Sequence, residues 1–401
     1  MLPLERYRML DLSRLLPGPA ASHILADMGM DVIKVEELNP RYGMGRDVLT
    51  PPNPTPETEV KWAAYNGLAR NKRSIALDLL DPDKRPECQE VFYRLAEQAD
   101  VILEGYRPGA VNWMGVDYES VSARNPRIIY CSISGYGQKG PYVKLPGHDP
   151  QYCSVAGSLP MGEGGPSGHG LPIADYSSGM YAAIGILTAL LEREQSGQGQ
   201  YIDVPMMGSI MSFLHGPWGR YFRDGELPQE ALPSVPQGVA YLRCGDGKYL
   251  STSNAETTFW ANFCQAIGRE RYTGKKGVTG DEAKAVVEDI QRIFLTKTRD
   301  EWLRILWDAD SCAAPVNDIP DTLKDPQVRE IGMVWETEHP TEGKIQQVGH
   351  PVLFSRTPAT LRTLAPVLGA HTRDVLRHAG FSDGEIAGLE ERGIVKSWSD
   401  A

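Results

Sequence analysis

The sequence predicts an α/β fold with a parallel sheet in a large domain, together with a separate, smaller domain. Short apolar strands alternate with helical segments from Arg8 to Val204. Beyond Phe222 the pattern changes, and polar segments containing proline lead to a hairpin and a group of helices. A length of 401 residues gives room for two or three domains, and 41% apolar with 23% charged residues is typical of a globular protein.

The N-terminal segment has the pattern of a strand, a helix and a second strand. Arg8 to Leu12 is a short apolar run, Pro17 to Pro19 breaks the chain, and Ala20 to Met28 has apolar residues at helical spacing. A second apolar strand follows at Val32 to Val35. A strand–helix–strand unit of this length implies a parallel pair joined by a right-handed crossover.

The alternation continues along the chain. After a stretch rich in Gly and Pro, from Gly135 to Gly170, the strongest helical pattern runs from about Ser177 to Arg193, and a strand follows at Tyr201 to Val204. The other elements expected in this part are the helix Glu87–Gln98 and the strands Ser74–Leu79, Val101–Leu103 and Ile128–Ile133.

The smaller domain is expected to begin with a hairpin, because the apolar runs Val239 to Cys244 and Lys248 to Thr252 are joined by Gly245-Asp246-Gly247. We expect the large domain over 1–222, the small domain over 227–325, and a C-terminal part, 326–401, that returns to the large domain. The expected helices are Phe259–Ile267, Glu282–Leu295 and Arg299–Trp307 and, in the tail, Thr372–Ala379 and Ser382–Arg392.

Charge and composition argue against several classes of partner. With 52 acidic and 41 basic residues the net charge is −11, which disfavours nucleic acid as the main partner because phosphate binding needs a surplus of Lys and Arg. The longest nearly apolar stretch, Gly179 to Leu191, is too short to span a bilayer, and the N-terminus lacks a signal pattern. We therefore expect no membrane partner and a cytoplasmic location.

The cysteines and histidines predict neither disulfides nor a metal site. The six cysteines are far apart and form no C-x-x-C, so we expect free thiols in a reducing compartment. The eight histidines show no H-x-x-x-H pair and no clustering with cysteine, so no metal site is expected.

Asp175 is the first candidate for chemistry. In the string LPIADYSSGMYAAIG it follows a short apolar run and comes just before a strong helix, at or next to the N-cap. Backbone N–H groups and the helix dipole favour an anion at that place. The carboxylate either caps the helix or acts as a nucleophile or base, and spacing alone does not choose between these roles.

His148 and Glu256 are further candidates. His148 lies in LPGHDPQY, and histidine is the side chain most readily tuned for proton transfer near neutral pH; a loop histidine bonded to the backbone is the alternative. Glu256, in STSNAETTFW, precedes a helix and is either a cap or a catalytic carboxylate. The Gly-rich string GYGQKG is followed by Pro141 and no helix, so no dinucleotide site is expected there.

Five blocks of sequence occur in a set order: DLSRLLPGPAASHILADMGMDVIKVE, NGLARNKRSIALDL, DVILEGYRPGAVNWMGV, NPRIIYCSISGYGQKGPY and ADYSSGMYAAIGILTALLEREQSGQGQYIDV. Two C-terminal segments follow, CAAPVNDIPDTLKDPQVRE and LGAHTRDVLRHAGFSDGEI. Together they resemble the family III CoA-transferases, which share their fold with the α-methylacyl-CoA racemases and include formyl-CoA and carnitine CoA-transferases.

The resemblance implies a large Rossmann-like domain and a small α+β domain joined by two linkers, with two chains interlocked as a dimer. Some members are built from two related chains, so a heterodimer or heterotetramer with a related chain is the alternative to a homodimer. The implied substrates are an acyl-CoA and a carboxylic acid. Coenzyme A then enters as a thioester substrate, and no permanently bound cofactor is expected.

In the transferases of this family one Asp at the start of a helix carries the exchange, and that position is Asp175 here. The resemblance implies that its carboxylate attacks the thioester to give a mixed aspartyl anhydride, which the released CoA thiolate converts into an aspartyl-CoA thioester. The acceptor acid then takes over the CoA, and no ATP is needed. The segments implied to contact CoA match Leu15, Leu16, Leu77, Tyr106, Ala110, Met114 and Lys144.

The competing activity in this family is racemisation of a 2-methylacyl-CoA, which would use His148 and Asp175 at the α-carbon, with Glu256 supporting the histidine. The strings DYSSGM and NGLARNKRSIALDL resemble the transferases more closely. The Gly-run flap of the formyl-CoA transferases is missing before Val239, so formyl or oxalyl substrates are not expected. We therefore expect a CoA-transferase that uses succinyl-CoA or another dicarboxylic acyl-CoA.

Overall fold

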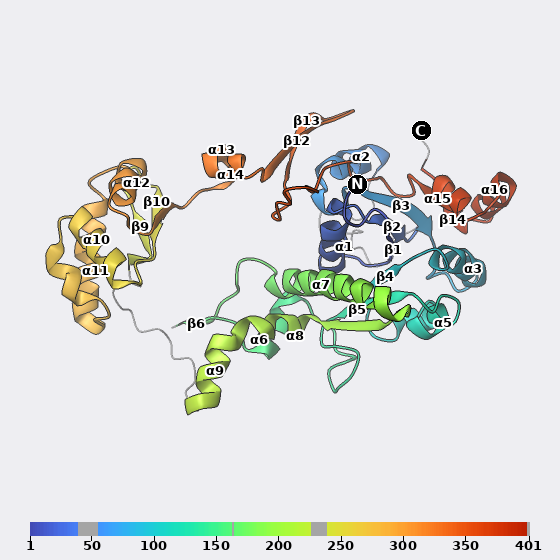
Figure 1. Cartoon of the computed structure of the whole chain (residues 1–401), viewed down its shortest axis with the longest axis horizontal. Coiled ribbons are helices and arrows are strands. Elements are labelled where there is room, and N and C mark those ends of the chain that lie inside the picture. The colour runs from blue at the N-terminus through green and yellow to red at the C-terminus, as the bar shows by residue number, and fades with distance from the viewer. Residues whose placement is uncertain (39–54, 163, 226–238, 399–401) are drawn as a thin grey trace. The chain divides into compact units, whose positions relative to one another are not determined.

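A computed structural model describes residues 1–38, 55–162, 164–225 and 239–398. The chain divides into two compact units: unit 1 comprises Met1–Gly216 and Gly332–Ala401, and unit 2 comprises Pro217–Ile331 (Figure 1). The domain limits expected from the sequence, 1–222, 227–325 and 326–401, stay a prediction, and the expected start of the small domain lies outside the described residues.

Unit 1 is built on a seven-stranded sheet in the order β14-β3-β2-β1-β4-β5-β8. All neighbouring strands are parallel except β14, which pairs antiparallel with β3. An order that grows in both directions from β1 is that of a doubly wound sheet. The strands are β1 (Arg8–Asp11), β2 (Asp31–Glu36), β3 (Lys72–Leu77), β4 (Val101–Glu104), β5 (Ile129–Ser134), β8 (Tyr201–Pro205) and β14 (Val395–Lys396).

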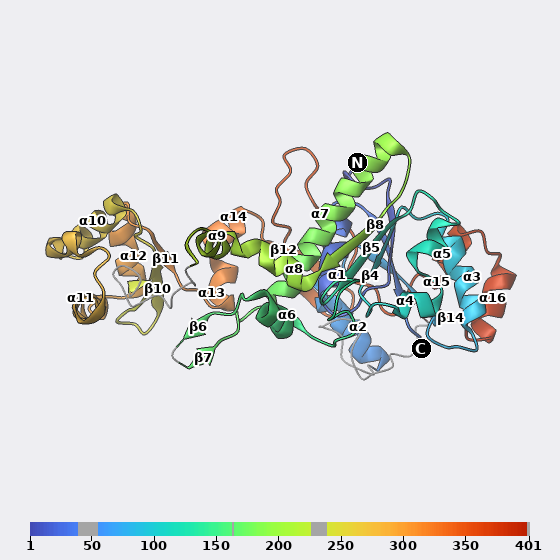
Figure 2. The same cartoon turned by 90° about the horizontal axis from the view of Figure 1, so that it is seen from below.

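Helices cover both faces of this sheet (Figure 2). Successive side chains of a strand point to opposite faces, so Met9 packs in one core and Leu10 in the other. The first core contains residues of α1 (Pro17–Asp27), α6 (Asp149–Ala156), α7 (Ile173–Ser196) and α8 (Met206–Met211). The second contains residues of α3 (Arg85–Ala96), α4 (Ala110–Met114), α5 (Tyr118–Ser122), α15 (Thr372–His378) and α16 (Asp383–Glu391).

The packing of α7 on α1 brings two candidate segments together. A Cβ added to Gly179 would lie 2.7 Å from the carbonyl oxygen of Pro17, so only glycine lets the two helices approach this closely. Pro17 begins α1 directly after Leu15 and Leu16, and Gly179 lies one turn after Asp175. The first turns of both helices are therefore held near each other.

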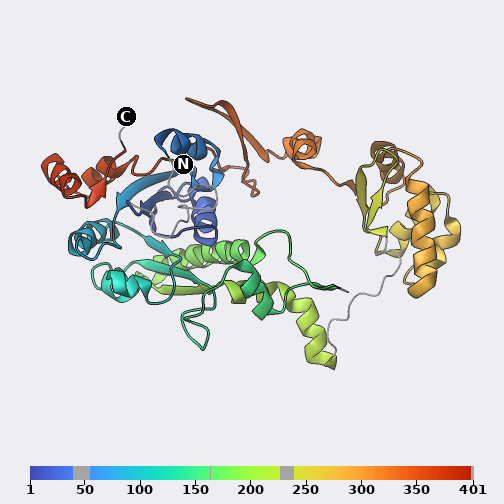
Figure 3. The ribbon, with the colours of Figure 1, turned by 180° about the vertical axis from the view of Figure 1, so that it is seen from behind.

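The C-terminal part of unit 1 returns to the N-terminal half. The hairpin of β12 (Val334–His339) and β13 (Gly343–Val348) packs on α2 (Pro56–Tyr65), where Gln347 Nε2 donates to the carbonyl oxygen of Ala64 at 3.2 Å. Farther on, the segment drawn in red adds β14 to the edge of the sheet beside β3 (Figure 3).

Unit 2 is an α+β unit. Three antiparallel strands, in the order β11-β10-β9, pack with helices around a core in which Phe263 stacks between Trp260 and Phe294, and Phe294 stacks on Trp302. Its elements are β9 (Tyr241–Arg243), β10 (Tyr249–Thr252), β11 (Ala313–Pro315), α10 (Thr257–Ala266), α11 (Gly280–Phe294), α12 (Arg299–Asp308), α13 (Ile319–Lys324) and α14 (Pro326–Glu330). Helix α9 (His215–Asp224) crosses the boundary between the two units.

The elements follow the sequence-based expectations, with two differences that concern the site. The helix expected from Ser177 begins at Ile173, so that it includes Asp175. The stretch Gly135 to Gly170, expected to be loose, contains α6 and the short strands β6 (Met161–Gly162) and β7 (Gly165–Pro166). All six cysteines are free thiols, as expected. Within the described ranges, no helix combines the length and apolar character that a membrane crossing requires.

Candidate active site

Asp175 is the third residue of α7 and lies in its first turn, partly buried. Pro172 occupies the N-cap position and supplies no side-chain hydrogen bond. The interpretation of Asp175 as the N-cap of this helix is therefore wrong. Its carboxylate remains available for chemistry at the positive end of a 24-residue helix.

The cap of α7 comes from another helix. Asp149, the first residue of α6, accepts hydrogen bonds at its Oδ2 from the backbone N–H of Ala174 at 2.6 Å and of Asp175 at 3.2 Å. The start of α6 thus meets the start of α7. Two carboxylates, Asp149 and Asp175, lie at this junction.

The environment of Asp175 disfavours its ionised form. Burial and, second, the negative charge of Asp149 raise the pKa of Asp175 from the ordinary 3.8 to about 7. Tyr152 lies nearby on α6. Burial and, second, the negative charge of Asp175 raise the pKa of the Tyr152 hydroxyl to about 12. A carboxylate of this basicity is a stronger nucleophile than an ordinary aspartate, and a substantial part of it is ionised at neutral pH.

His148 precedes α6 as its N-cap and is exposed. Its backbone N–H donates to Gln151 Oε1 at 3.0 Å, so this residue helps to start the helix that carries Asp149. Glu256 is exposed and is the N-cap residue of α10 in unit 2. The catalytic roles expected for both residues stay predictions.

The expected CoA contacts Leu15 and Tyr106 lie at the carboxyl edge of the sheet. Leu15 and Leu16 follow β1, and Tyr106 follows β4. The chain order of the sheet reverses between β1 and β4, and ligands of doubly wound sheets bind outside the strand ends at such a switch point. Leu15 has a positive φ of 64°, a conformation that costs energy for a residue with a side chain and often marks a functional segment.

Polar side chains fix the two loops at this switch point. The buried carboxylate of Glu104, at the end of β4, accepts the backbone N–H of Tyr106 at 2.7 Å, and burial raises its pKa to about 7. The guanidinium of Arg14 lies 4.9 Å from the centre of the Tyr106 ring and donates to Glu37 at 2.7 Å. The loop after β1 is thereby held against the loop after β4.

The other expected CoA contacts differ in their exposure. Ala110 begins α4 and is partly exposed, and Lys144 is exposed in the loop before α6. The side chains of Leu77 and Met114 are buried in the core beneath α3 and α4. All of these residues stay predicted contacts.

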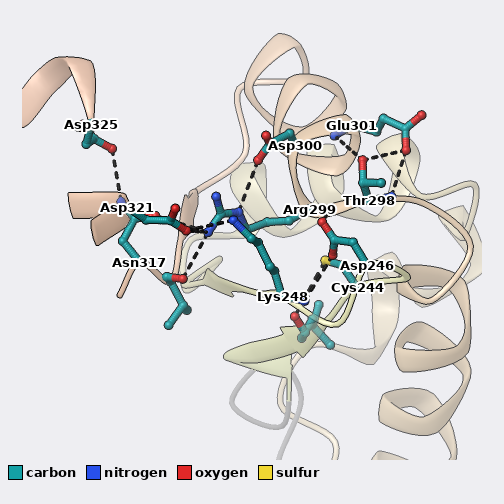
Figure 4. Close-up of polar contacts among 12 residues, drawn as sticks. Cys244, Asp246, Lys248, Thr298, Arg299, Asp300, Glu301, Asn317, Asp321 and Asp325 are labelled. Carbon is teal, nitrogen blue, oxygen red and sulfur yellow. Dashed lines mark hydrogen bonds and ion pairs between the residues drawn. The ribbon is translucent and has the colours of Figure 1, made fainter. Parts of the chain in front are cut away.

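Unit 2 contains a cavity of about 340 Å³ beside α12 and α13, and Figure 4 shows polar contacts of several residues that line it. At its wall the buried Arg299 pairs with Asp300 at 3.2 Å and Asp321 at 3.4 Å and donates to the side-chain oxygen of Asn317. Lys248 pairs with Asp321 at 2.9 Å. The cavity is lined by three basic side chains, Arg299, Arg304 and Lys324, and by three acidic ones, Asp300, Asp321 and Asp325. These charges balance, so the cavity offers no excess positive charge to an anionic substrate.

Two residues of the candidate site, Asp149 and Glu104, are not predicted from the sequence. In LPGHDPQY only His148 is predicted as a candidate, because an adjacent aspartate does not normally face the same way as its neighbour. The signal for Asp149 was the pair Asp149-Pro150, since proline is favoured in the first turn of a helix. Glu104 had no signal beyond its place at the end of an apolar strand.

Comparison with known proteins identifies the family pattern. The family model described as CoA-transferase family III matches residues 4–372. The chain is 30% identical to a formyl-CoA:oxalate CoA-transferase of Bradyrhizobium sp. (strain ORS 278), covering 98% of this chain and 97% of that protein. It is 31% identical to the succinyl-CoA:glutarate CoA-transferase of Homo sapiens, covering 98% and 90%.

Solved structures agree with this pattern. The crystal structure of a CAIB/BAIF family protein from Brucella suis superposes with a TM-score of 0.78 at 26% identity, covering 94% of this chain and 99% of that one. The similarity extends over the parallel sheet and over both units of the chain.

Proposed function

This chain belongs to CoA-transferase family III, and we propose that it moves CoA from a dicarboxylic acyl-CoA to a free carboxylic acid through covalent catalysis at Asp175. The observation that carries the proposal is the placement of Asp175. Its carboxylate lies in the first turn of α7, but it is not the N-cap of that helix. Burial and the charge of Asp149 raise its pKa to about 7. It is therefore partly accessible and has the raised basicity that a nucleophile needs.

The proposed reaction exchanges one activated acyl group for another. The Asp175 carboxylate attacks the thioester carbonyl and expels CoA thiolate, which leaves a mixed anhydride. The thiolate then attacks the aspartyl carbonyl and releases the donor acid, so that CoA is held as an aspartyl thioester. The acceptor carboxylate attacks the carbonyl carbon of that thioester and expels CoA thiolate again, which leaves a second mixed anhydride. The thiolate finally attacks the acceptor's carbonyl, and the Asp175 carboxylate leaves unchanged.

The CoA moiety is proposed to lie at the switch point between β1 and β4. The loops that carry Leu15, Leu16 and Tyr106 end there, and the close approach of α1 to α7 at Gly179 supports a path from these loops to Asp175. At the start of α1, Pro17 and Pro19 have no backbone N–H, and the N–H of Ala20 donates to the carbonyl oxygen of Leu16 at 2.9 Å, so this helix end offers few donors to the cofactor portion.

A dicarboxylic substrate pair is proposed from the relatives together with the sequence. The human relative is named for succinyl-CoA and glutarate, and the other for formyl-CoA and oxalate, at nearly equal identity. Because the Gly-run flap is missing from this sequence, we favour the larger dicarboxylates. Succinyl-CoA as donor with glutarate as acceptor is the first pair to assay.

The test separates transfer from racemisation, which would use His148 and Asp175 as proton carriers. The protein is incubated in D₂O with succinyl-CoA or a 2-methylacyl-CoA, with and without acceptor acids, and mass spectrometry detects new thioesters and α-deuterium. We expect new thioesters that depend on the acceptor, no α-deuterium, and a larger loss for Asp175→Ala than for His148→Ala. Rapid deuterium uptake without acceptor, abolished equally by both substitutions, would replace the transferase proposal with the racemase.

We propose that the active form is a dimer of this chain. Exposed apolar side chains follow one side of α7, at Tyr176, Met180 and Ile184, in steps of four residues. A row with this spacing forms one stripe on a helix, and a stripe of exposed large side chains is typical of an interface. A complex with a related chain is the alternative, which co-purification with such a chain would support.

A further inference from the structure

The first turn of α7 depends on a carboxylate from outside the helix. The first N–H groups of any α-helix have no partner within it, and an N-cap side chain normally accepts one of them. At α7 the N-cap is Pro172, so no side-chain oxygen is available from that position. Asp149 Oδ2 accepts both the Ala174 and the Asp175 N–H groups instead, at 2.6 and 3.2 Å.

The second oxygen of Asp149 is also engaged. Its Oδ1 lies 3.5 Å from Cys153 Sγ, one turn farther along α6, and the start of α6 itself favours a negative charge at Asp149. The carboxylate is thus held from both sides. One of its hydrogen bonds ends on the peptide nitrogen of Asp175 itself, so any shift of Asp149 moves the main chain of that residue.

The charged groups around Asp175 are few. Asp149 and Tyr152 face it from α6, and Tyr152 in turn feels the charges of Tyr136 and Arg107. Helix α1, which packs along α7, carries two ionisable residues, His23 and Asp27, and they pair with each other toward the C-terminal end of α1. Helix α8, with the sequence MMGSIM, carries none. Asp149 is therefore the carboxylate that acts most directly on Asp175.

We propose that Asp149 is a positioning residue that holds the main chain of Asp175 in place and sets the charge environment of its carboxylate. This proposal rests on the proposed function, since it takes Asp175 as the nucleophile. The negative charge of Asp149 offsets part of the positive field at the start of α7, which would otherwise stabilise the ionised Asp175 and weaken it as a nucleophile.

Two substitutions separate the hydrogen bonds from the charge. Asp149→Asn keeps a side-chain oxygen that can accept the two N–H groups but removes the charge. Asp149→Ala removes both. Asp117→Asn is the matched control, because Asp117 caps α5 in the same unit by accepting the N–H of Ser120 and lies outside the candidate site.

The first readout is the pKa of Asp175 itself. It is measured by NMR on protein labelled with ¹³C at the aspartate carboxyl carbons, and the signal is assigned by its loss in Asp175→Asn. We expect both substitutions of Asp149 to lower that pKa by about one unit, of the order of the variation that folded environments impose on carboxyl groups, and the control to leave it unchanged. An unchanged pKa in both variants would overturn the proposal.

The second readout is the pH dependence of CoA transfer. We expect the rise of kcat/KM with pH, centred near 7 in the wild type, to move to lower pH in both variants. The plateau kcat should fall only a few fold in Asp149→Asn but at least about tenfold more in Asp149→Ala, because the first turn of α7 then loses its acceptor and Asp175 its position. Equal plateau values in the two variants would contradict the positioning role.

The two proposals fail in different ways. If wild-type protein forms no acceptor-dependent thioester but the NMR signal of Asp175 shifts as expected, the proposed function is wrong while the effect of Asp149 on Asp175 stands. If transfer occurs and depends on Asp175 but neither readout responds to Asp149, the positioning role is wrong and the proposed function stands.

Discussion

Arg70 donates two hydrogen bonds to the buried carboxylate of Asp27, at 3.1 and 2.6 Å, and its third side-chain nitrogen donates to the carbonyl oxygen of Val348. Asp27 ends α1, and Val348 belongs to the segment that returns after unit 2. His350, from the same returning segment, lies 3.5 Å from the Asp27 carboxylate. One buried ion pair thus joins the two parts of the chain that make up unit 1.

Asp27→Asn should destabilise unit 1 strongly. Burial opposes ionisation of Asp27, but hydrogen bonds from His350 and Arg70 outweigh it and hold its pKa well below the usual range. Asparagine leaves the buried Arg70 charge without its partner, which costs about 3–5 kcal/mol in comparable cases. Urea denaturation measures the loss.

The stability lost in Asp27→Asn should depend on pH, and it should exceed the loss caused by removing an exposed ion pair. Because the folded-state pKa of Asp27 is lowered, its contribution is full above about pH 5 and is lost as the pH falls below 4, so the difference from wild type should shrink in acid. Asp383→Asn, in the exposed pair of Asp383 with Arg377, should change stability by less than about 1 kcal/mol. Equal losses for the buried and exposed pairs would contradict this account.

Gly179→Ala should impair both stability and transfer. The added Cβ meets the Pro17 carbonyl oxygen at 2.7 Å, so α7 has to move away from α1 and Asp175 moves with it. We expect a destabilisation of about 1–3 kcal/mol and a lower kcat. Gly185→Ala, on the same helix, meets only Ile202 at 3.4 Å and should be neutral or stabilising. Indistinguishable variants would contradict a close contact at Gly179.

Asp175→Asn should stabilise the fold at alkaline pH while abolishing transfer. The pKa of Asp175 is raised to about 7, so the folded state binds this proton more tightly than the unfolded chain. The ionised group therefore costs stability that accumulates between about pH 4 and 7. We expect the variant to be more stable than wild type by about 1–2 kcal/mol at pH 8, a value reduced from the full shift because Asp175 is partly exposed, and equal at pH 3. Thermal melts at both pH values measure the difference, and no gain at pH 8 would argue against a raised pKa.

The protein should have twice the 44.2 kDa mass of one chain in light scattering. Ile184→Glu places a charge in the exposed apolar stripe of α7 and should reduce the dimer, whereas Gln195→Glu, exposed on the same helix, should not. A monomer that retains full activity would contradict the dimer.

Much of the fold follows from local patterns. The strands of unit 1 are apolar runs bounded by Gly, Pro or polar residues, and the segment from Ala20 to Val35 folds into the predicted helix and strand. The hairpin of β9 and β10 forms at its Gly245-Asp246-Gly247 turn. These elements are predictable because their signals lie within a few residues of each other.

The contacts that build the site are not local. The hydrogen bond from Asp175 to Asp149 spans 26 residues, and that from Arg70 to Val348 spans 278, so neither leaves a periodic signal in the sequence. Helix α6 is not predicted, because the surrounding stretch is rich in glycine and proline, which are typical of loops. Asp175 itself was found because a helix start and a family resemblance coincide at that residue.

The most direct test of the account is to trap the covalent intermediate on Asp175. Wild-type protein is incubated with succinyl-CoA and hydroxylamine, which captures an aspartyl anhydride or thioester as a hydroxamate, and is then digested and analysed by mass spectrometry. We predict inactivation and a hydroxamate on the peptide that contains Asp175, with none in the absence of succinyl-CoA and none in Asp175→Asn. An unmodified Asp175 in protein that transfers CoA at full rate, or near-normal transfer by Asp175→Ala, would contradict nucleophilic catalysis by this residue.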